Sequence, residues 1–151
     1  ALLRAVGPTG HLTSYEIRDE FATMARENVA RFHGPAPQWT IKIGDAYEGF
    51  DETEIDRMVV DLSEPWRVVP HAARALRPGG VFVGFTPTVL QLKQLVDELR
   101  AGPFAAVEIL ESLQRYWHVK DRSVRPEHRM VAHSGFLIIA RRLALSPPTS
   151  E

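Results

Sequence analysis

The chain has 151 residues, 44% of them hydrophobic, a formal net charge of −1 and no cysteine. This composition fits one soluble domain, which we expect over residues 1–143 with a disordered tail over 144–151, and it excludes disulfides, thiolate metal sites and a cysteine nucleophile. A net charge near zero excludes a uniformly basic nucleic-acid surface. No apolar run reaches the ~20 residues that cross a membrane. The absence of cysteine fits a reducing compartment, and we expect the cytoplasm.

Apolar spacing and turn residues predict ten elements along the chain. In order they are helix 1–6, strand 11–16, helix 17–32, strand 39–43, a strand ending at residue 61, helix 66–76, strand 81–85, helix 89–100, strand 104–117 and strand 135–140. Alternation of strands and helices with short connections predicts an α/β fold with a doubly wound parallel sheet. The last two strands have only a polar, basic segment between them, which predicts a C-terminal antiparallel hairpin.

The first predicted helix has no start signal before it and ends at Gly7-Pro8. We therefore expect that the sequence begins inside a helix and is a fragment of a longer chain. It contains neither G-x-G-x-x-G nor G-x-x-x-x-G-K-[ST]. In folds of this type a glycine-rich phosphate loop follows the first strand, so we expect that loop upstream of Ala1.

The segment from Met58 to Trp66 is the one we expect to be the chemical centre. Met58, Val59 and Val60 predict a strand buried on both faces, which ends at Asp61 and is followed by Pro65-Trp66. Ligands of open α/β sheets bind beyond the carboxyl ends of the strands, so Asp61 should face a cleft with Pro65-Trp66 as its wall. The alternative is that Asp61 only caps the helix beginning near Trp66.

Three acids stand at or just past the ends of successive predicted strands: Glu16, Asp45 and Asp61. A carboxylate in the position of Glu16 can accept hydrogen bonds from both hydroxyls of a ribose. Asp45 can accept from the exocyclic amine of an adenine, or it can simply start a turn. Because the carboxyl ends of parallel strands share one edge of a sheet, we expect the three acids to line a common rim.

Residues 115–129 hold five cations and the adjacent aromatics Tyr116 and Trp117. Such a segment can bind phosphates and stack a base, although a solvated loop with Trp117 in the core explains it equally well. The histidines are dispersed and form no metal-binding motif, so we expect no metal. Ser63 and Ser134 lack the surroundings of a serine nucleophile.

Several motifs together resemble the tRNA (adenine-N1)-methyltransferases of the TrmI type, which modify adenosine 58 in the T-loop. They are a strand ending in Glu16, Gly44-Asp45-Ala46, Val-Val-Asp-x-x-x-Pro-Trp over 59–66, Leu-Arg-Pro-Gly-Gly over 76–80, Arg115-x-Trp117, Arg125-Pro126 and His-Ser-Gly-Phe-Leu over 133–137. Leu-Arg-Pro-Gly-Gly is shared by many S-adenosylmethionine-dependent methyltransferases. The likeness runs to about Arg142, with mild departures at Ser63, where many members have proline, and at Ser134, where threonine is usual.

The resemblance implies a Rossmann-like class I methyltransferase domain without its first strand and N-terminal β domain, and a cytoplasmic enzyme, typically a tetramer, acting on tRNA. It implies S-adenosylmethionine as cofactor, with Glu16 binding its ribose and with Asp45 and Ala46 binding its adenine. Asp61 would contact the cofactor and also hold the target base, as the catalytic residue. The substrate-binding residues that it suggests are Pro65, Trp66, Arg115, Arg125 and His133.

Three other functions remain open. One is a class I methyltransferase acting on a small molecule or a protein, and another is a non-catalytic tRNA-binding subunit, which would have no need of Glu16, Asp45 and Asp61. A nicotinamide-dependent dehydrogenase would explain Glu16 but not the segment from Asp61 to Trp66. We expect the fragment alone to be inactive, because strands beside a missing central strand would lack partners.

Overall fold

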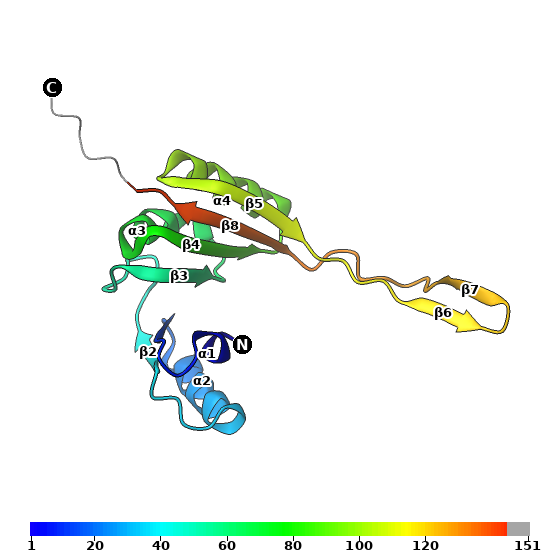
Figure 1. The fold of residues 1–151 in the computed structure, drawn as a ribbon, viewed down its shortest axis with the longest axis horizontal. Coiled ribbons are helices and arrows are strands. Elements are labelled where there is room, and N and C mark those ends of the chain that lie inside the picture. The colour runs from blue at the N-terminus through cyan, green and yellow to red at the C-terminus, as the bar shows by residue number, and fades with distance from the viewer. Residues whose placement is uncertain (145–151) are drawn as a thin grey trace. The chain divides into compact units, whose positions relative to one another are not determined.

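The computed structural model describes residues 1–144 and divides the chain into two compact units, Ala1–Gly49 and the residues from Phe50 onward (Figure 1). Most of the tail expected over 144–151 therefore lies outside the described residues. No helix among residues 1–144 is long and apolar enough to span a membrane.

The first unit contains two parallel strands and two helices. They are α1 (Leu2–Val6), β1 (Leu12–Glu16), α2 (Asp19–Phe32) and β2 (Trp39–Ile43). Strands β1 and β2 pair in parallel, with Glu16 opposite Ile43 at their carboxyl ends. The indole Nε1 of Trp39 donates to Ser14 Oγ at 3.0 Å, which ties the opening of β2 to the middle of β1.

The second unit contains a four-stranded mixed sheet and a small hairpin. Its elements are β3 (Ile55–Val60), the 3₁₀ helix η1 (Pro65–Val68), α3 (Val69–Ala75), β4 (Leu76–Thr86), α4 (Val89–Ala101), β5 (Phe104–Glu111), β6 (Trp117–Lys120), β7 (Ser123–Pro126) and β8 (Phe136–Arg142). The sheet order is β3-β4-β8-β5, with β3 and β4 parallel and β8 antiparallel to both of its neighbours. This confirms the α/β class and the C-terminal antiparallel pair.

The core of the second unit lies between the sheet and helices α3 and α4, which both pass behind the sheet in Figure 1. Phe82 on β4 is fully buried and meets Phe104 edge to face, with 5.9 Å between the ring centroids. Helix α4 lies so close to β4 that a Cβ atom on Gly84 would come within 2.6 Å of the side chain of Leu95. A glycine at this position allows the close approach.

Strand β3 is buried on one face, so the expectation that both faces are buried was wrong. Met58 and Val60 are buried, whereas Val59 is 53% exposed. Side chains alternate along a strand, and α3 and α4 both pack behind this sheet, so the face that carries Val59 has no helix of this unit on it.

Two boundaries also differ from expectation. The predicted turn over 77–80 is an irregularity inside β4, which starts at Leu76 and pairs with β3 on both sides of a register shift. The predicted strand 104–117 ends at Glu111, and the basic segment after it forms the hairpin of β6 and β7. Because β6 and β7 pair only with each other, charged residues can occupy both strands without being buried.

Candidate active site

The carboxyl ends of β1 and β2 bring Glu16 and Asp45 to the same edge of the first unit. The strands are paired up to Glu16 and Ile43, and Gly44 N then donates to Glu16 O at 3.0 Å. The Glu16 side chain is half-buried, and its Oε1 accepts from Arg18 N at 3.0 Å. One carboxylate oxygen thus orients the side chain, and Oε2 has no hydrogen-bond partner among residues 1–144.

Asp45 starts a turn, as one of its two expected roles required. Its Oδ1 accepts from Tyr47 N at 2.8 Å, and its carbonyl oxygen accepts from Glu48 N at 3.0 Å. The turn leaves the half-buried Ala46 directly after a carboxylate whose second oxygen is unbonded within the described chain. The turn role and a ligand role are therefore compatible, since each uses a different oxygen.

Asp61 lies in the second unit, directly after β3, and its side chain is exposed. It makes no hydrogen bond or ion pair with any residue in 1–144. The N-cap of η1 is Glu64, without a side-chain capping bond, so Asp61 does not cap the following helix. The capping alternative is thereby excluded, and the carboxylate is available to a ligand.

Pro65 and Trp66 open η1, four and five residues after Asp61. Pro65 is buried and Trp66 is half-buried, so the proline anchors the segment and the tryptophan keeps part of its surface open. The backbone closes locally, with Arg67 N donating to Glu64 O at 3.1 Å. The side chain of Arg67 also pairs with that of Glu64, at 3.0 Å.

His133 precedes β8 and has both ring nitrogens engaged. Nδ1 lies 2.6 Å from Glu111 Oε1, and Nε2 lies 2.6 Å from Pro87 O. The bond to the Glu111 carboxylate, and after it the bond to the Pro87 carbonyl, raises the pKa of His133 above its ordinary value. A substrate could therefore meet the charge or the face of this ring, but not a free ring nitrogen.

Arg115 and Arg125 lie on the segment between β5 and β8, residues 112–135, which we call the arm. Arg115 is exposed, and Arg125 is half-buried opposite His118 on the β6–β7 hairpin. The Nη1 atom of Arg125 is buried and has no hydrogen-bond partner in the described part of the chain. Trp117 is 61% exposed, so the alternative that placed it in the core was wrong.

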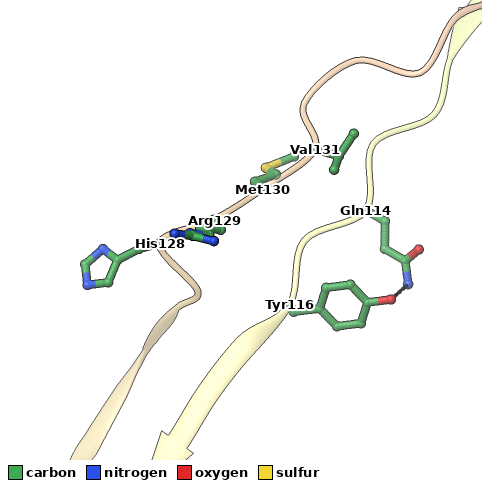
Figure 2. Close-up of a pocket in the computed structure, with 6 residues that line it drawn as sticks. All are labelled: Gln114, Tyr116, His128, Arg129, Met130 and Val131. Carbon is green, nitrogen blue, oxygen red and sulfur yellow. Dashed lines mark hydrogen bonds between the residues drawn. The ribbon is translucent and has the colours of Figure 1, made fainter.

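A cavity of about 630 Å³ lies in the arm, between the two irregular segments that connect the β6–β7 hairpin to β5 and β8 (Figure 2). Its lining residues are Gln114, Tyr116, His128, Arg129, Met130 and Val131. Gln114 Nε2 donates to Tyr116 Oη at 2.9 Å, as the dashed line in Figure 2 shows. Val131 is 81% exposed, so this is an open hollow with apolar and cationic walls.

Two residues of the second unit escaped the sequence reasoning. Gln91 reaches Ser63 across 28 positions of sequence, with Nε2 donating to the backbone oxygen at 2.9 Å, and Glu111 holds His133. The sequence offered one signal, since Thr88-x-x-Gln91 has the spacing of a capping box and marks the start of α4. No sequence pattern identified Glu111. No group of three or more His, Asp or Glu side chains in residues 1–144 could hold a metal ion.

The fold is that of a class I S-adenosylmethionine-dependent methyltransferase domain, as two solved structures that it matches show. A crystal structure of a SAM-dependent O-methyltransferase from Thermotoga maritima matches 97% of this chain with a TM-score of 0.88 and 36% identity, and the chain covers 55% of it. The tRNA (m1A58) methyltransferase TrmI from Aquifex aeolicus matches 89% of this chain with a TM-score of 0.78 and 25% identity, and 54% of that chain is covered.

The chain belongs to the family described as tRNA methyltransferase complex GCD14 subunit, whose model matches residues 1–134. It is 33% identical to the tRNA (adenine(57)-N(1)/adenine(58)-N(1))-methyltransferase TrmI of Methanocaldococcus jannaschii over 165 residues, which cover 93% of this chain and 58% of the relative. It is 34% identical to the tRNA (adenine(58)-N(1))-methyltransferase TrmI of Thermus thermophilus over 147 residues, covering 93% and 55%. The chain thus spans a little over half the length of these relatives, and the resemblance inferred from its motifs is confirmed.

Proposed function

We propose that this chain is the catalytic part of a tRNA (adenine(58)-N(1))-methyltransferase that takes its methyl group from S-adenosylmethionine. The observation that carries the proposal is the family match over residues 1–134, which includes every predicted acid. Glu16 ends β1, Asp45 and Asp61 follow the ends of β2 and β3, and each keeps at least one carboxylate oxygen unbonded within residues 1–144.

The hydrogen-bond acceptors of the first unit fit S-adenosylmethionine. Glu16 has its Oε1 fixed by Arg18 N and its Oε2 open to a ribose hydroxyl, and Asp45 has one oxygen open to an adenine amine. Ala46 would lie beside the adenine, where a small side chain leaves room for a flat ring. S-adenosylmethionine, when bound, supplies a methyl group on a positively charged sulfur.

Asp61 would hold the target adenine. Adenine N1 carries a lone pair and needs no base to activate it, so the protein mainly supplies alignment. A hydrogen bond from the exocyclic amine of adenine to Asp61 would orient the ring and stabilise the positive charge that develops when N1 is methylated. Asp61 can also contribute to the cofactor site, as the resemblance implies.

The adenine must leave the folded T-loop to be reached, and extruded bases are held by stacking and packing. Trp66 offers a partly open aromatic surface, and the buried Pro65 fixes its place. Arg115 and Arg125, with the positive ring of His133, would bind the tRNA backbone, since cations position nucleic acids through their phosphates.

The arm also suits contact with a second copy of this chain. Tyr116, Trp117 and Val119 are each more than 60% exposed and follow one another closely, which is unusual on a surface that has no partner. We therefore propose a homo-oligomer, with a tetramer as the expected state. Sedimentation of the complete gene product tests it: Trp117→Glu should shift it toward monomer, and a monomeric parent protein would contradict the assignment.

The direct test of function is methyl transfer by the complete gene product to unmodified tRNA, followed by nucleoside mass spectrometry. We expect 1-methyladenosine with the parent tRNA and none with a tRNA carrying uridine at position 58. Transfer to both tRNAs, or to neither, would contradict the proposal. Because the proposed substrate is tRNA, the expected location is the cytoplasm.

Cofactor binding by the complete gene product is tested separately by calorimetry. Glu16→Ala should weaken S-adenosylmethionine binding by about 10-fold or more, because a charged acceptor of a hydrogen bond contributes about 1.5–3 kcal/mol. The control is Glu20→Ala, which removes an exposed acid from the first turn of α2. Equal binding by the Glu16 variant and the control would remove Glu16 from the cofactor site.

A second candidate function rests on one observation, the 36% identity to a structure described as a SAM-dependent O-methyltransferase. An O-methyltransferase must remove a proton from a hydroxyl, whereas adenine N1 has none to lose. Transfer to a small hydroxylated acceptor without any transfer to tRNA would favour this second function.

A further inference from the structure

Two sets of hydrogen bonds, joined by the backbone between Pro87 and Thr88, cross the second unit from β5 toward the loop that carries Asp61. The first set begins with Glu111 Oε1, 2.6 Å from His133 Nδ1, and continues with His133 Nε2, 2.6 Å from Pro87 O. Both partners of the ring are acceptors, and a neutral imidazole has only one N–H to give. The two short contacts are therefore satisfied together only by the protonated ring.

The next links lie at the start of α4. Thr88 follows Pro87 and is the N-cap of the helix: its Oγ1 accepts from Gln91 N at 3.3 Å and donates to Gln91 Oε1 at 2.7 Å. In a capping box the glutamine side chain would return to the backbone N–H of the cap residue. Here it is held by the threonine hydroxyl instead, which fixes the side-chain amide with its NH₂ group pointing to another element.

That NH₂ group ends the second set of bonds. Gln91 Nε2 donates to Ser63 O at 2.9 Å, in the loop between β3 and η1, two residues after Asp61. The ion pair of Arg67 with Glu64 joins neighbouring residues of the chain, whereas the bond from Gln91 ties the loop to a different element, helix α4. A loop that holds a reacting group needs such support, because a displacement of about 1 Å can cost about 100-fold in rate.

We propose that Gln91 is a positioning residue for the loop from Asp61 to Trp66, and that Thr88, Pro87, His133 and Glu111 hold Gln91 in place. The proposal rests on the proposed function, since it assigns the reaction to Asp61. Among residues 1–144, Glu111 is the charged group in contact with the His133 ring, while the β4–α4 turn offers it the neutral carbonyl of Pro87 and β8 offers the ring of Phe136, 4.9 Å away between centroids.

The test is Gln91→Glu in the complete gene product. Glutamate keeps the oxygen that accepts from Thr88, so α4 stays capped, but it turns an acceptor toward Ser63 O and removes the bond from residue 91 to the loop. The matched control is Gln94→Glu, on an exposed position of the same helix. We expect faster amide hydrogen exchange over residues 61–66 and a kcat for tRNA methylation about 10-fold to 100-fold lower, with S-adenosylmethionine affinity within twofold of the parent.

The two readouts separate the proposals. Unchanged exchange over residues 61–66 in Gln91→Glu would overturn the positioning role, whatever the activity. If the parent protein does not methylate tRNA, the proposed function fails, and the exchange result still decides whether Gln91 holds the loop. A loss of rate in Gln94→Glu equal to that in Gln91→Glu would also overturn the role, since it would show an effect of charge on α4 alone.

Discussion

Asp61 and His133 both lie in the second unit, but they differ in whether their hydrogen-bonding atoms are free to bind a ligand. The Asp61 carboxylate is exposed and unbonded within the described residues, whereas both nitrogens of His133 are engaged by Glu111 and Pro87. A group that must bind a substrate needs open hydrogen-bonding capacity, and a group that holds structure does not. The difference is consistent with the role in the reaction that we propose for Asp61, and with a supporting role of His133 beside its proposed contact with the tRNA backbone.

The pKa of His133 is raised, which makes its contribution depend on pH. A raised pKa in the folded state means that the stabilisation is complete below the unfolded pKa, about 6.5, and is lost as the pH rises through the folded value. We expect NMR titration to give a His133 pKa above about 6.5, and exchange over residues 131–135 to rise above that pKa.

The control for this titration is Glu111→Gln. It keeps an acceptor beside His133 Nδ1 and removes the negative charge, so the His133 pKa should fall toward its ordinary value and the change in exchange should move to lower pH. An unchanged titration in this variant would show that Glu111 does not hold the ring.

At the scale of elements, the sequence predicted most clearly those with strong apolar periodicity. Helix α4 was expected over 89–100 and spans Val89–Ala101, and β2 was expected at its observed bounds, Trp39–Ile43. The β6–β7 hairpin was missed because its apolar residues, among them Val119 and Val124, are exposed and alternate with cations. A hairpin that buries little leaves no buried face to detect.

The sequence predicted the residues of the candidate site that end strands, but not the contacts that depend on how the elements pack. Acids at strand ends could be found because the end of a strand is visible in the sequence, and the structure brings Glu16 and Asp45 to one edge of the first unit. The bond from Gln91 to Ser63 could not be found, since it depends on how a loop meets a helix end 28 positions away. The convergence of Asp61 with the other two acids stays a prediction.

Gly135 is required where β8 begins. Its φ is +150°, and a Cβ atom would lie 2.3 Å from the ring of Phe85. We expect Gly135→Ala to lower the free energy of unfolding by about 2–4 kcal/mol, through overpacking and backbone strain. Denaturant unfolding measures this, with Gly102→Ala as the control, where the nearest atom would be 3.4 Å away. Equal stability of the two variants would contradict the close packing of Gly135 on Phe85.

At the scale of the whole molecule, a near-neutral protein must concentrate its charge to bind a polyanion, and the arm does so with five cations in residues 115–129. Each phosphate contact releases bound counterions, so affinity falls with salt in proportion to the number of contacts.

Removing Arg115, Arg122 and Arg129 together by alanine should weaken tRNA binding and reduce the slope of log affinity against log salt by about 2–3. Filter binding of the complete gene product over a range of salt concentrations measures both. The control removes Lys93 and Arg100, two exposed cations of α4. A slope equal to that of the parent protein in the arm variant would place the tRNA elsewhere.

The most direct test of the central claim compares Asp61→Ala with Asp56→Ala in the complete gene product. Asp61 directly follows β3, whereas Asp56 is the second residue of that strand and pairs with Arg77 at 2.7 Å. Formation of 1-methyladenosine in tRNA should fall about 100-fold or more in Asp61→Ala, with S-adenosylmethionine affinity within about threefold of the parent, and should persist in Asp56→Ala. Methylation by Asp61→Ala at the parental rate would contradict the account.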